Sequence, residues 1–395
     1  MNHAWLLPEY VEDILPPYAG QVERLRRGLL DLFEAWGYEL IHPPLIEYLE
    51  SLLTGTARDL DLKTFKVVDA LSGRLLGVRA DITPQAARID AHLLNRQGPT
   101  RLCYAGAALH TRPAALTHSR ELLQVGAELF GHAGVEADAE VLQLLAAALR
   151  ATGLAEVRVS LGHVGLFQAL ADAAGLTEGS RQALFQALQA KDLPSLQALV
   201  RGLDPQWAQA LLELPELYGS PAVLAEARRA LPPLPGIERA LQELERLAAV
   251  DTGLAVLIDL ADLRGYGYHN GVMFAAYAGG QAQAVALGGR YDGVGALFGR
   301  ARPATGFSLD LRRVLDGLPA PAPRGGILAP WSEDAALRAR VAELRARGER
   351  VVQELPGQEM HRAEYGCDRI LVRQGEGWHV QPLTMQTSDR REEQR

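Results

Sequence analysis

Apolar residues recur at helical spacing near the start of the chain and then give way to extended runs. The residues that repeat every three or four positions are Val22, Leu25, Leu29, Leu32, Phe33 and Trp36. Gly37 is placed to end this helix, and the run YELIHPPLIEY that follows is typical of an extended segment. The pattern therefore predicts a long helix that leads into a strand.

Alternating apolar positions then predict a sheet. The segments TFKVVD and LLGVRAD flank the turn signal Ser72-Gly73, which indicates a hairpin. Thr83 and Pro84 are typical of the N-cap and first position of a helix, which we expect to continue to Leu94. Two further strands, RLCYAGAAL and ELLQVGAELF, are joined by the polar loop 110–120. We therefore expect an antiparallel sheet with helices on one side.

The second half of the chain changes from helix back to strand. A helix is expected over 135–151, and residues 164–249 are rich in Ala, Leu and Gln with prolines between short periodic runs. From Ala255 the segments AVLIDLADL, VMFAAYA and AQAVALG read as strands. The glycine-rich GGRYDGVGALFG follows them, and a helix is expected near 307–315.

These elements predict an α+β protein in which an antiparallel sheet is flanked by helices. We expect residues 1–163 and 251–318 to form the two parts of one core, with a helical insertion at 164–250 between them. The linker LPAPAPRGG precedes a small C-terminal α/β domain at 324–385. Residues 386–395 are charged and are expected to be a disordered tail.

Composition narrows the functional class. The first residues lack the basic start and apolar run of a secretory signal, and no stretch reaches about eighteen uninterrupted apolar residues, so we expect a cytoplasmic protein that does not enter a membrane. Cys103 and Cys367 lie far apart without CxxC spacing, which favours packing roles over a disulfide or zinc site. The formal charge of -8 argues mildly against broad nucleic-acid binding. None of the three lysines follows a Gly-rich turn, which excludes a P-loop.

One predicted strand carries candidate chemistry. In ELLQVGAELF a period of two places Gln124, Gly126 and Glu128 on the same face. Gly126 leaves room for a group to approach the backbone, and the two polar side chains offer hydrogen-bond partners beside that space. The alternative is a strand with one solvated face, which periodicity alone does not exclude.

Three other segments are ambiguous by themselves. In VRADITPQAARIDA, Asp81 is able to accept hydrogen bonds from an ammonium group, and Thr83 is able to cap a helix. In LRGYGYHNGVMF, Arg264 suits a carboxylate and lies near Tyr268 and His269 among three glycines. GGRYDGVGALFG is equally consistent with a structural turn in which glycines adopt positive φ.

Taken in order, these segments resemble the signatures of histidyl-tRNA synthetase, a class II aminoacyl-tRNA synthetase. GYELIHPPLIEY is similar to motif 1, RLCYAGAALHTRPAALTHSRELLQVGAELFG to motif 2, and GGRYDGV with ATGFSLDLRRVL to motif 3. VRADIT and LRGYGYHNG resemble the two histidine-binding signatures. The likeness covers roughly residues 8–317 and implies a class II synthetase-like fold and, through motif 1, a homodimer.

The resemblance assigns a histidine-binding role to seven residues. It makes Asp81 and Thr83 partners of the ammonium group with Gln124 assisting, and Glu128 the partner of the imidazole. The remaining contacts would be a carboxylate partner and two residues that close over the ring, which are Arg264, Tyr268 and His269. The synthetase signature has glutamate at the position of Asp81 and tyrosine at that of His269, which leaves the ring contacts and the affinity open.

The ATP site departs from the synthetase pattern. His110 replaces the arginine that grips the α-phosphate, and Arg112 replaces the glutamate that follows it. Asp310 stands where a small glycine adjoins the adenine, and His118 replaces a second arginine, although Arg313 persists. Adenylate formation depends on charge stabilisation at phosphorus, so we expect no amino-acid activation.

The short C-terminal segment also departs from the larger anticodon-binding domain of synthetases. Together with the segment LTGTARDLDLKTFKVVDALSGRLLGVRADIT, it resembles the regulatory subunits of ATP phosphoribosyltransferase. That resemblance implies a non-catalytic chain without cofactor or metal, which joins a short-form catalytic subunit, binds histidine and does not bind tRNA. The alternatives are an active histidyl-tRNA synthetase, against which His110, Arg112 and Asp310 weigh, and another amino-acid-sensing or RNA-binding synthetase paralogue.

Overall fold

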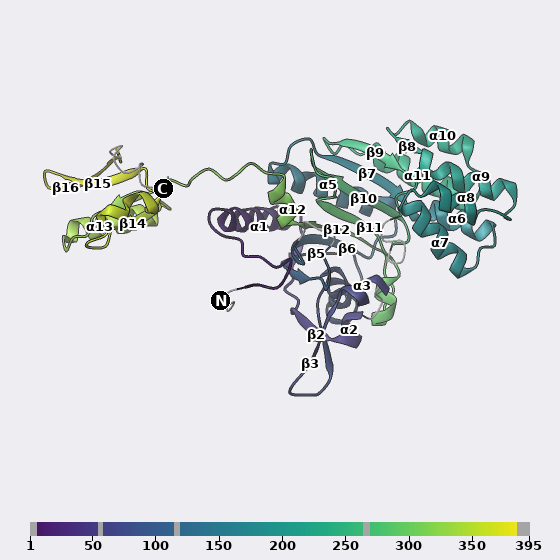
Figure 1. The fold of residues 1–395 in the computed structure, drawn as a ribbon, viewed down its shortest axis with the longest axis horizontal. Helices are drawn as coiled ribbons and strands as arrows, with labels where there is room; N and C mark the ends of the chain where they lie inside the picture. The colour runs from purple at the N-terminus through teal and green to yellow at the C-terminus, as the bar shows by residue number, and fades with distance from the viewer. Residues whose placement is uncertain (1–5, 54–57, 114–118, 264–268, 385–395) are drawn as a thin grey trace. The chain divides into compact units, whose positions relative to one another are not determined.

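The computed structural model describes residues 6–53, 58–113, 119–263 and 269–384. The chain forms two compact units, Met1–Pro319 and Ala320–Arg395. Figure 1 shows the helices and strands of each unit along the chain. Within the described residues, no helix is both long enough and apolar enough to cross a membrane.

A nine-stranded sheet forms the centre of the larger unit, in the order β1-β5-β6-β12-β11-β10-β7-β9-β8. Its pairings are antiparallel except for β1 with β5 and β7 with β9. The α+β prediction is therefore confirmed. The strands are β1 Glu39–Leu40, β5 Thr100–Leu109, β6 Glu121–Phe130, β7 Arg158–His163, β8 Tyr218–Gly219, β9 Ala255–Asp259, β10 Val272–Tyr277, β11 Ala286–Arg290 and β12 Ala304–Asp310.

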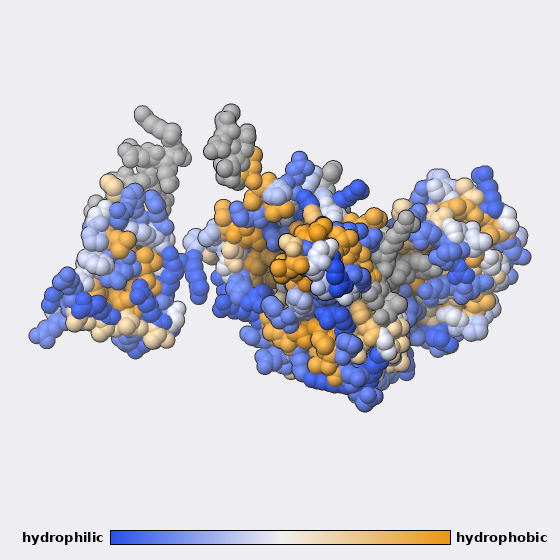
Figure 2. All heavy atoms as spheres, turned by 90° about the horizontal axis from the view of Figure 1, so that it is seen from below, coloured by the Kyte–Doolittle hydropathy of each residue, from blue (hydrophilic) through white to orange (hydrophobic). Residues whose placement is uncertain are grey.

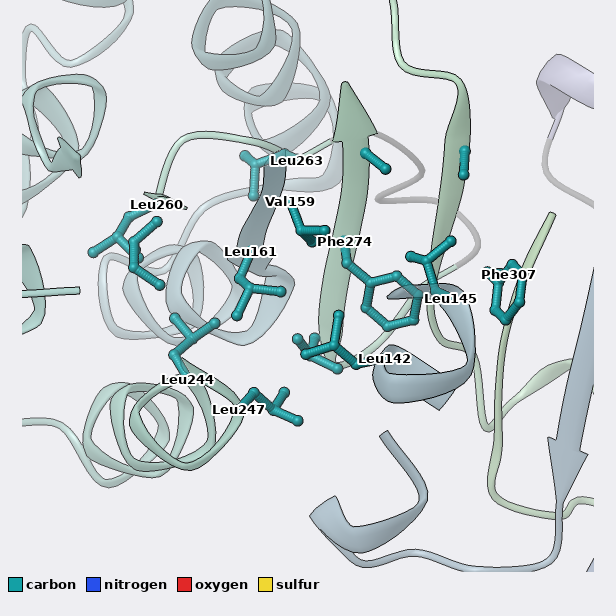
Figure 3. Close-up of a cluster of buried hydrophobic side chains, with 14 of the residues drawn as sticks. Leu142, Leu145, Val159, Leu161, Leu244, Leu247, Leu260, Leu263, Phe274 and Phe307 are labelled. Atoms are coloured by element: carbon teal, nitrogen blue, oxygen red, sulfur yellow. The ribbon is translucent and has the colours of Figure 1, made fainter. Parts of the chain in front are cut away.

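The main core lies between one face of this sheet and the helices α1 (Tyr18–Ala35) and α5 (Val135–Thr152). Both helices were predicted close to these bounds. Figure 3 shows Leu142 and Leu145 of α5 near Phe274 and Phe307 of the sheet. Side chains of this size each contribute about 1.5–3 kcal/mol when fully buried, so this layer is the main source of stability.

Helices also cover part of the opposite face, which differs from the prediction of helices on one side only. Leu102 and Tyr104 alternate with Cys103 along β5, and they pack in a second cluster with Ile82 and Ala86. These last two residues belong to or adjoin α4 (Thr83–Arg88). The sheet is therefore buried on both faces in this region. The alternation of polar and apolar residues along β6 does not reveal this, because it is equally typical of a strand with one solvated face.

The segment 164–250 is helical, as predicted, apart from β8 and a 3-10 turn at Leu214–Glu216. Several of its helices begin at a side chain that accepts a backbone N–H: His163 for α6, Thr177 for α7, Asp192 for α8 and Asp204 for α9. Leu244 and Leu247 join the main core together with Val159 and Leu161 of β7 (Figure 3). The helices are α6 Val164–Ala173, α7 Glu178–Gln189, α8 Leu193–Leu199, α9 Pro205–Glu213, α10 Val223–Ala230 and α11 Pro235–Ala248.

A separate three-stranded sheet has the order β2-β4-β3, with β2 at Ile46–Tyr48, β3 at Phe65–Val68 and β4 at Leu75–Val78. The predicted hairpin is confirmed by the antiparallel pairing of β3 with β4. The Asp69 carboxylate accepts hydrogen bonds from the backbone of Leu71 and Ser72, which closes the turn before Gly73 at φ +69°. Two short helices, α2 Leu49–Leu53 and α3 Arg58–Lys63, lie between β2 and β3.

This sheet leaves apolar residues exposed. Figure 2 shows such residues gathered on the side of the larger unit where β2 and β3 lie in Figure 1. The exposed apolar residues of this region and its flanks include Leu40, Leu45, Ile46, Tyr48, Leu62, Val67, Val68, Leu71 and Leu75. Contiguous apolar surface of this kind is typical of a protein interface.

Two predicted boundaries were wrong, and one predicted helix changes type along its length. The run YELIHPPLIEY forms two strands in different sheets, because Pro43 and Pro44 lie between β1 and β2. The helix predicted from Thr83 to Leu94 has the predicted extent, but it is α-helical only to Arg88 and continues as a π-helix at Ile89–Leu94. The helix predicted near 307–315 begins only at α12, Leu311–Asp316, because β12 continues to Asp310.

The smaller unit contains the predicted strand, helix and further strands. Its sheet has the order β14-β13-β15-β16, and the helix α13 (Ala335–Ala346) connects the parallel strands β13 and β14. Leu337 and Val341 of α13 pack on Ile327 and Leu371 of the sheet. The tail predicted at 386–395 lies outside the described residues. The other elements are β13 Ile327–Ala329, β14 Val351–Gln353, a 3-10 helix at Glu359–Tyr365, β15 Arg369–Gln374 and β16 Gly377–Pro382.

Candidate functional site

Strand register places Gln124, Gly126 and Glu128 on one face of β6, as the sequence predicts. On β12, Glu128 lies opposite Gly306 and Gln124 lies opposite Asp310. On β5, the residue opposite Gly126 is Tyr104. A side chain at Gly306 would overlap the Glu128 carboxylate, so the glycine is required for that carboxylate to fit.

The Glu128 carboxylate lies at the centre of a buried hydroxyl cluster. Its Oε1 accepts hydrogen bonds from Thr83 Oγ1 and from the Tyr104 hydroxyl, both at 2.9 Å. Its Oε2 accepts one from the Tyr291 hydroxyl at 2.5 Å. Glu128 is 1% exposed, and Tyr104 and Tyr291 are 0% and 2% exposed. Three hydroxyl groups therefore donate hydrogen bonds to this buried carboxylate.

Burial sets the electrostatics of this cluster. It raises the pKa of Glu128 from 4.5 to about 8, although the hydrogen bonds from Tyr291, Tyr104 and Thr83 act in the opposite direction. Burial also raises the pKa of Tyr104. At neutral pH the site therefore holds an acid that is poised to lose its proton to, or share it with, a basic group placed beside it.

Asp81 and Gln124 form the other polar end of the site. Asp81 Oδ1 accepts hydrogen bonds from Gln124 Nε2 at 2.7 Å and from the backbone N–H of Thr83 at 3.1 Å. Gln124 Oε1 accepts from the backbone N–H of Ile82 at 3.0 Å. The prediction that Thr83 is the N-cap of α4 was wrong, because the N-cap residue is Ile82. The Thr83 hydroxyl is held by Glu128 instead.

Glycines on this face make room for the chain's own side chains. The space above Gly126 is occupied by the Tyr104 hydroxyl, and the space above Gly289 is occupied by the ring of His269. Gly289 pairs with Gly306, which in turn pairs with Glu128, so His269 lies two strands away on the same face. Of the seven predicted residues, Arg264 and Tyr268 lie outside the described residues. The other five occupy this one face.

Sequence reasoning missed Tyr104 and Tyr291. Tyr104 occupies an inward position of RLCYAGAAL, but its proximity to Glu128 depends on the β5–β6 register, which no local pattern gives. Tyr291 belongs to GGRYDG, whose glycines are by themselves equally consistent with a structural turn. In the structure Gly288, Gly289 and Arg290 are in β11, and Tyr291 follows directly. Arg290 is held by Asp138 of α5 at 2.7 Å, which fixes the end of this strand.

Residues that the sequence predicted for a degenerate ATP site lie around a neighbouring cavity of about 660 Å³. His110, Arg112, Asp310 and Arg313 line it, together with Gln124. His110 Nε2 lies 3.0 Å from the carbonyl oxygen of Ala80, and burial lowers the pKa of its imidazole. The fourth predicted replacement, His118, lies outside the described residues.

Asp310 has a structural role in addition to lining the cavity. Its Oδ1 accepts hydrogen bonds from the backbone N–H groups of Arg312 and Leu123, each at 3.2 Å, so it caps α12 and ties it to β6. Oδ2 lies 3.6 Å from Nε of Arg313. Burial raises the pKa of Asp310. A carboxylate therefore occupies part of the cavity wall beside Arg313.

Comparison with known proteins gives the family. A family model described as histidyl-tRNA synthetase matches residues 10–314, and one described as the ATP phosphoribosyltransferase subunit HisZ C-terminal domain matches 324–381. The chain is 58% identical over 378 residues to the ATP phosphoribosyltransferase regulatory subunit of Ralstonia nicotianae, which covers 96% of this chain and 98% of that protein. The regulatory subunit of Cupriavidus pinatubonensis is 56% identical over 382 residues, 97% of this chain and 100% of that protein.

A solved structure supports the same assignment. The crystal structure described as an ATP phosphoribosyltransferase regulatory subunit/histidyl-tRNA synthetase from Bacillus halodurans matches with a TM-score of 0.82 and 28% identity. The match covers 93% of this chain and 97% of that one. The class II synthetase-like fold predicted from the motifs is therefore confirmed, and the chain belongs to the family of ATP phosphoribosyltransferase regulatory subunits.

Proposed function

We propose that this chain binds histidine on the β6 face and thereby mediates feedback inhibition of the catalytic ATP phosphoribosyltransferase with which it assembles. Family membership gives the chain a regulatory, non-catalytic role in histidine biosynthesis. The observation that carries the histidine proposal is the buried Glu128 carboxylate, 2.9 Å from Thr83 and from Tyr104, on the same face as the Asp81–Gln124 pair.

The chemistry of this face matches the polar groups of histidine. Asp81 supplies an anion for the ammonium group, and Glu128 supplies an acceptor or donor for an imidazole nitrogen. Thr83 lies between them, since its backbone N–H binds Asp81 and its hydroxyl binds Glu128. Arg264 is proposed for the carboxylate, and Tyr268 and His269 for the ring. The hydroxyls that now bind Glu128 would rearrange around the bound imidazole.

Three further parts of the proposal concern partners and location. The partner is a short-form catalytic subunit, and the exposed apolar residues around β1 and β2 support a homodimer through the motif 1 region. No tRNA is bound, since the net charge is -8 and the C-terminal unit is small. The complex works in the cytoplasm, where histidine would reach the site directly.

Titration calorimetry of histidine into the isolated full chain tests the binding step. We expect binding of histidine but not of histamine, which has no carboxylate. Replacing Glu128 with glutamine should weaken histidine binding by roughly ten- to a hundred-fold, because a charge-assisted hydrogen bond is lost. Glu121→Gln is a matched control, since Glu121 lies on the same strand and pairs with Arg312 instead. Equal affinity of the Glu128 variant and the parent would rule out this face as the site.

A further inference from the structure

The cavity beside the proposed histidine site is a continuation of the same sheet face. Leu287 pairs with Ser308, and Asp310 pairs with Gln124, so these residues of β11, β12 and β6 form its floor. Gln124 is the one residue that also belongs to the Asp81 pair. The cavity is therefore adjacent to the proposed histidine site and shares only Gln124 with the residues proposed for histidine that the structure describes.

Backbone pairing holds the opposite wall in place. Thr64 and His110 form an isolated antiparallel bridge, and the backbone N–H of Thr111 donates to the carbonyl of Lys63 at 2.9 Å. The Thr111 hydroxyl donates to the carbonyl of Leu62 at 2.6 Å. These bonds place the side chains of Lys63 and Arg112 on two neighbouring segments of one wall.

The cavity has an excess of positive charge. Lys63 and Arg112 are exposed at its edge, and within the part of the chain that the structure describes neither has a carboxylate within ion-pair distance. Arg313 lies 3.6 Å from Asp310, so this pair is close to neutral. The imidazole of His110 is kept neutral because burial lowers its pKa. Two uncompensated cations therefore face this space, which favours an anion.

The remaining lining favours an organic anion over a bare ion. The cavity volume of about 660 Å³ is in the range of sites for small organic ligands. Leu62, Leu122 and Leu287 supply an apolar surface on which a ring or carbon chain is able to pack. A phosphate monoester carries about -1.5 to -2 charges at neutral pH, which matches two cations, whereas a carboxylate carries only one.

We propose that this cavity is a second ligand site, in which Lys63 and Arg112 bind the phosphate group of a small organic phosphate whose body packs on β11 and β12. Glu128, Thr83 and Asp81 take no part in its lining, and Gln124 is the one described residue of the proposed histidine site that does, so the two ligands are expected to bind separately. Arg112, which stands where the synthetase pattern has a glutamate, is one of the two cations. The charges that line this cavity therefore differ from those expected in a synthetase ATP site.

Calorimetry of the full chain with AMP, ribose 5-phosphate and inorganic phosphate as probes tests the proposal. We expect at least one of the two organic phosphates to bind, more tightly than inorganic phosphate and less tightly as salt rises. Lys63→Ala and Arg112→Ala should each weaken that binding by roughly ten-fold or more, and Arg112→Glu should weaken it further. Lys66→Ala is the matched control, because Lys66 pairs with Asp61 at 2.7 Å and does not line the cavity.

Histidine binding measured on the same variants separates this proposal from the proposed function. Lys63→Ala and Arg112→Ala should bind histidine as the parent does, and Glu128→Gln should bind the organic phosphate as the parent does. The proposal is overturned if neither organic phosphate binds at millimolar concentration, or if inorganic phosphate binds equally well. It is also overturned if histidine displaces the probe competitively, since the cavity would then be part of the amino-acid site.

Discussion

Replacing Glu128 with glutamine should change how the stability of the chain depends on pH. The pKa of Glu128 is raised from 4.5 to about 8 by burial, so between these values the folded chain keeps a proton that the unfolded chain has released. Stability contributed by this group is therefore fully present below pH 4.5 and is lost as pH rises through about 8. Glutamine is uncharged and resembles the protonated acid, so it should remove this loss.

The magnitude follows from the size of the shift. Each pKa unit corresponds to about 1.4 kcal/mol, so the shift from 4.5 to about 8 corresponds to roughly 5 kcal/mol over the whole range. Most of it should be lost by pH 7.5. The assay is denaturant unfolding of the parent and the variant between pH 5 and 8.5, with the difference in unfolding free energy taken at each pH so that other titrating groups cancel. A difference that does not change with pH would show that Glu128 is not a buried acid with a raised pKa.

Three other predictions test the remaining parts of the account. The chain should not catalyse histidine-dependent exchange of pyrophosphate into ATP, because His110 and Arg112 replace the phosphate clamp, and exchange at a synthetase-like rate would refute this. Light scattering at micromolar concentration should show at least a dimer, and Leu40→Glu should weaken it because Leu40 is 59% exposed in the motif 1 region; a clean parent monomer would contradict the interface. Arg302→Ala should cost roughly 3–5 kcal/mol in unfolding free energy, because it leaves the buried Asp90 carboxylate, now 2.8 Å away, without its partner. Arg300→Ala should cost much less, because Arg300 is only half-buried and its side chain donates to the uncharged Asn95 and Gln97, and equal losses would refute the buried-pair argument.

Local patterns predicted most of the elements. The spacing of Leu29 and Phe33 gave α1, and the alternation along β6 placed Gln124 and Glu128 on one face, because period and burial are properties of a single segment. The turn between Asp69 and Gly73 was likewise visible, since its hydrogen bonds are local. Many other residues are equally polar, and only the family resemblance indicated these ones as candidates for the site.

Contacts between distant segments were not predictable in the same way. The hydroxyls of Tyr104 and Tyr291 meet at Glu128 only because β5, β6, β12 and β11 are paired in one register. Asp310 appeared only as a change in the ATP site, whereas its backbone contacts to Leu123 and Arg312 make it a cap. The end of β12 at Asp310 was missed because Ser308, Leu309 and Asp310 fit either a strand or the first turn of a helix.

The central claim is that histidine bound beside Glu128 in this chain inhibits the catalytic subunit. The most direct measurement is a histidine titration of ATP phosphoribosyltransferase activity in the complex with this chain, made with the parent or with Glu128→Gln and normalised to each complex's rate without histidine. We predict that the variant needs roughly ten- to a hundred-fold more histidine for half-inhibition, in proportion to its loss of histidine affinity. If calorimetry shows that the variant has lost histidine affinity while half-inhibition occurs at the parental concentration, the inhibitory site lies elsewhere and the claim is wrong.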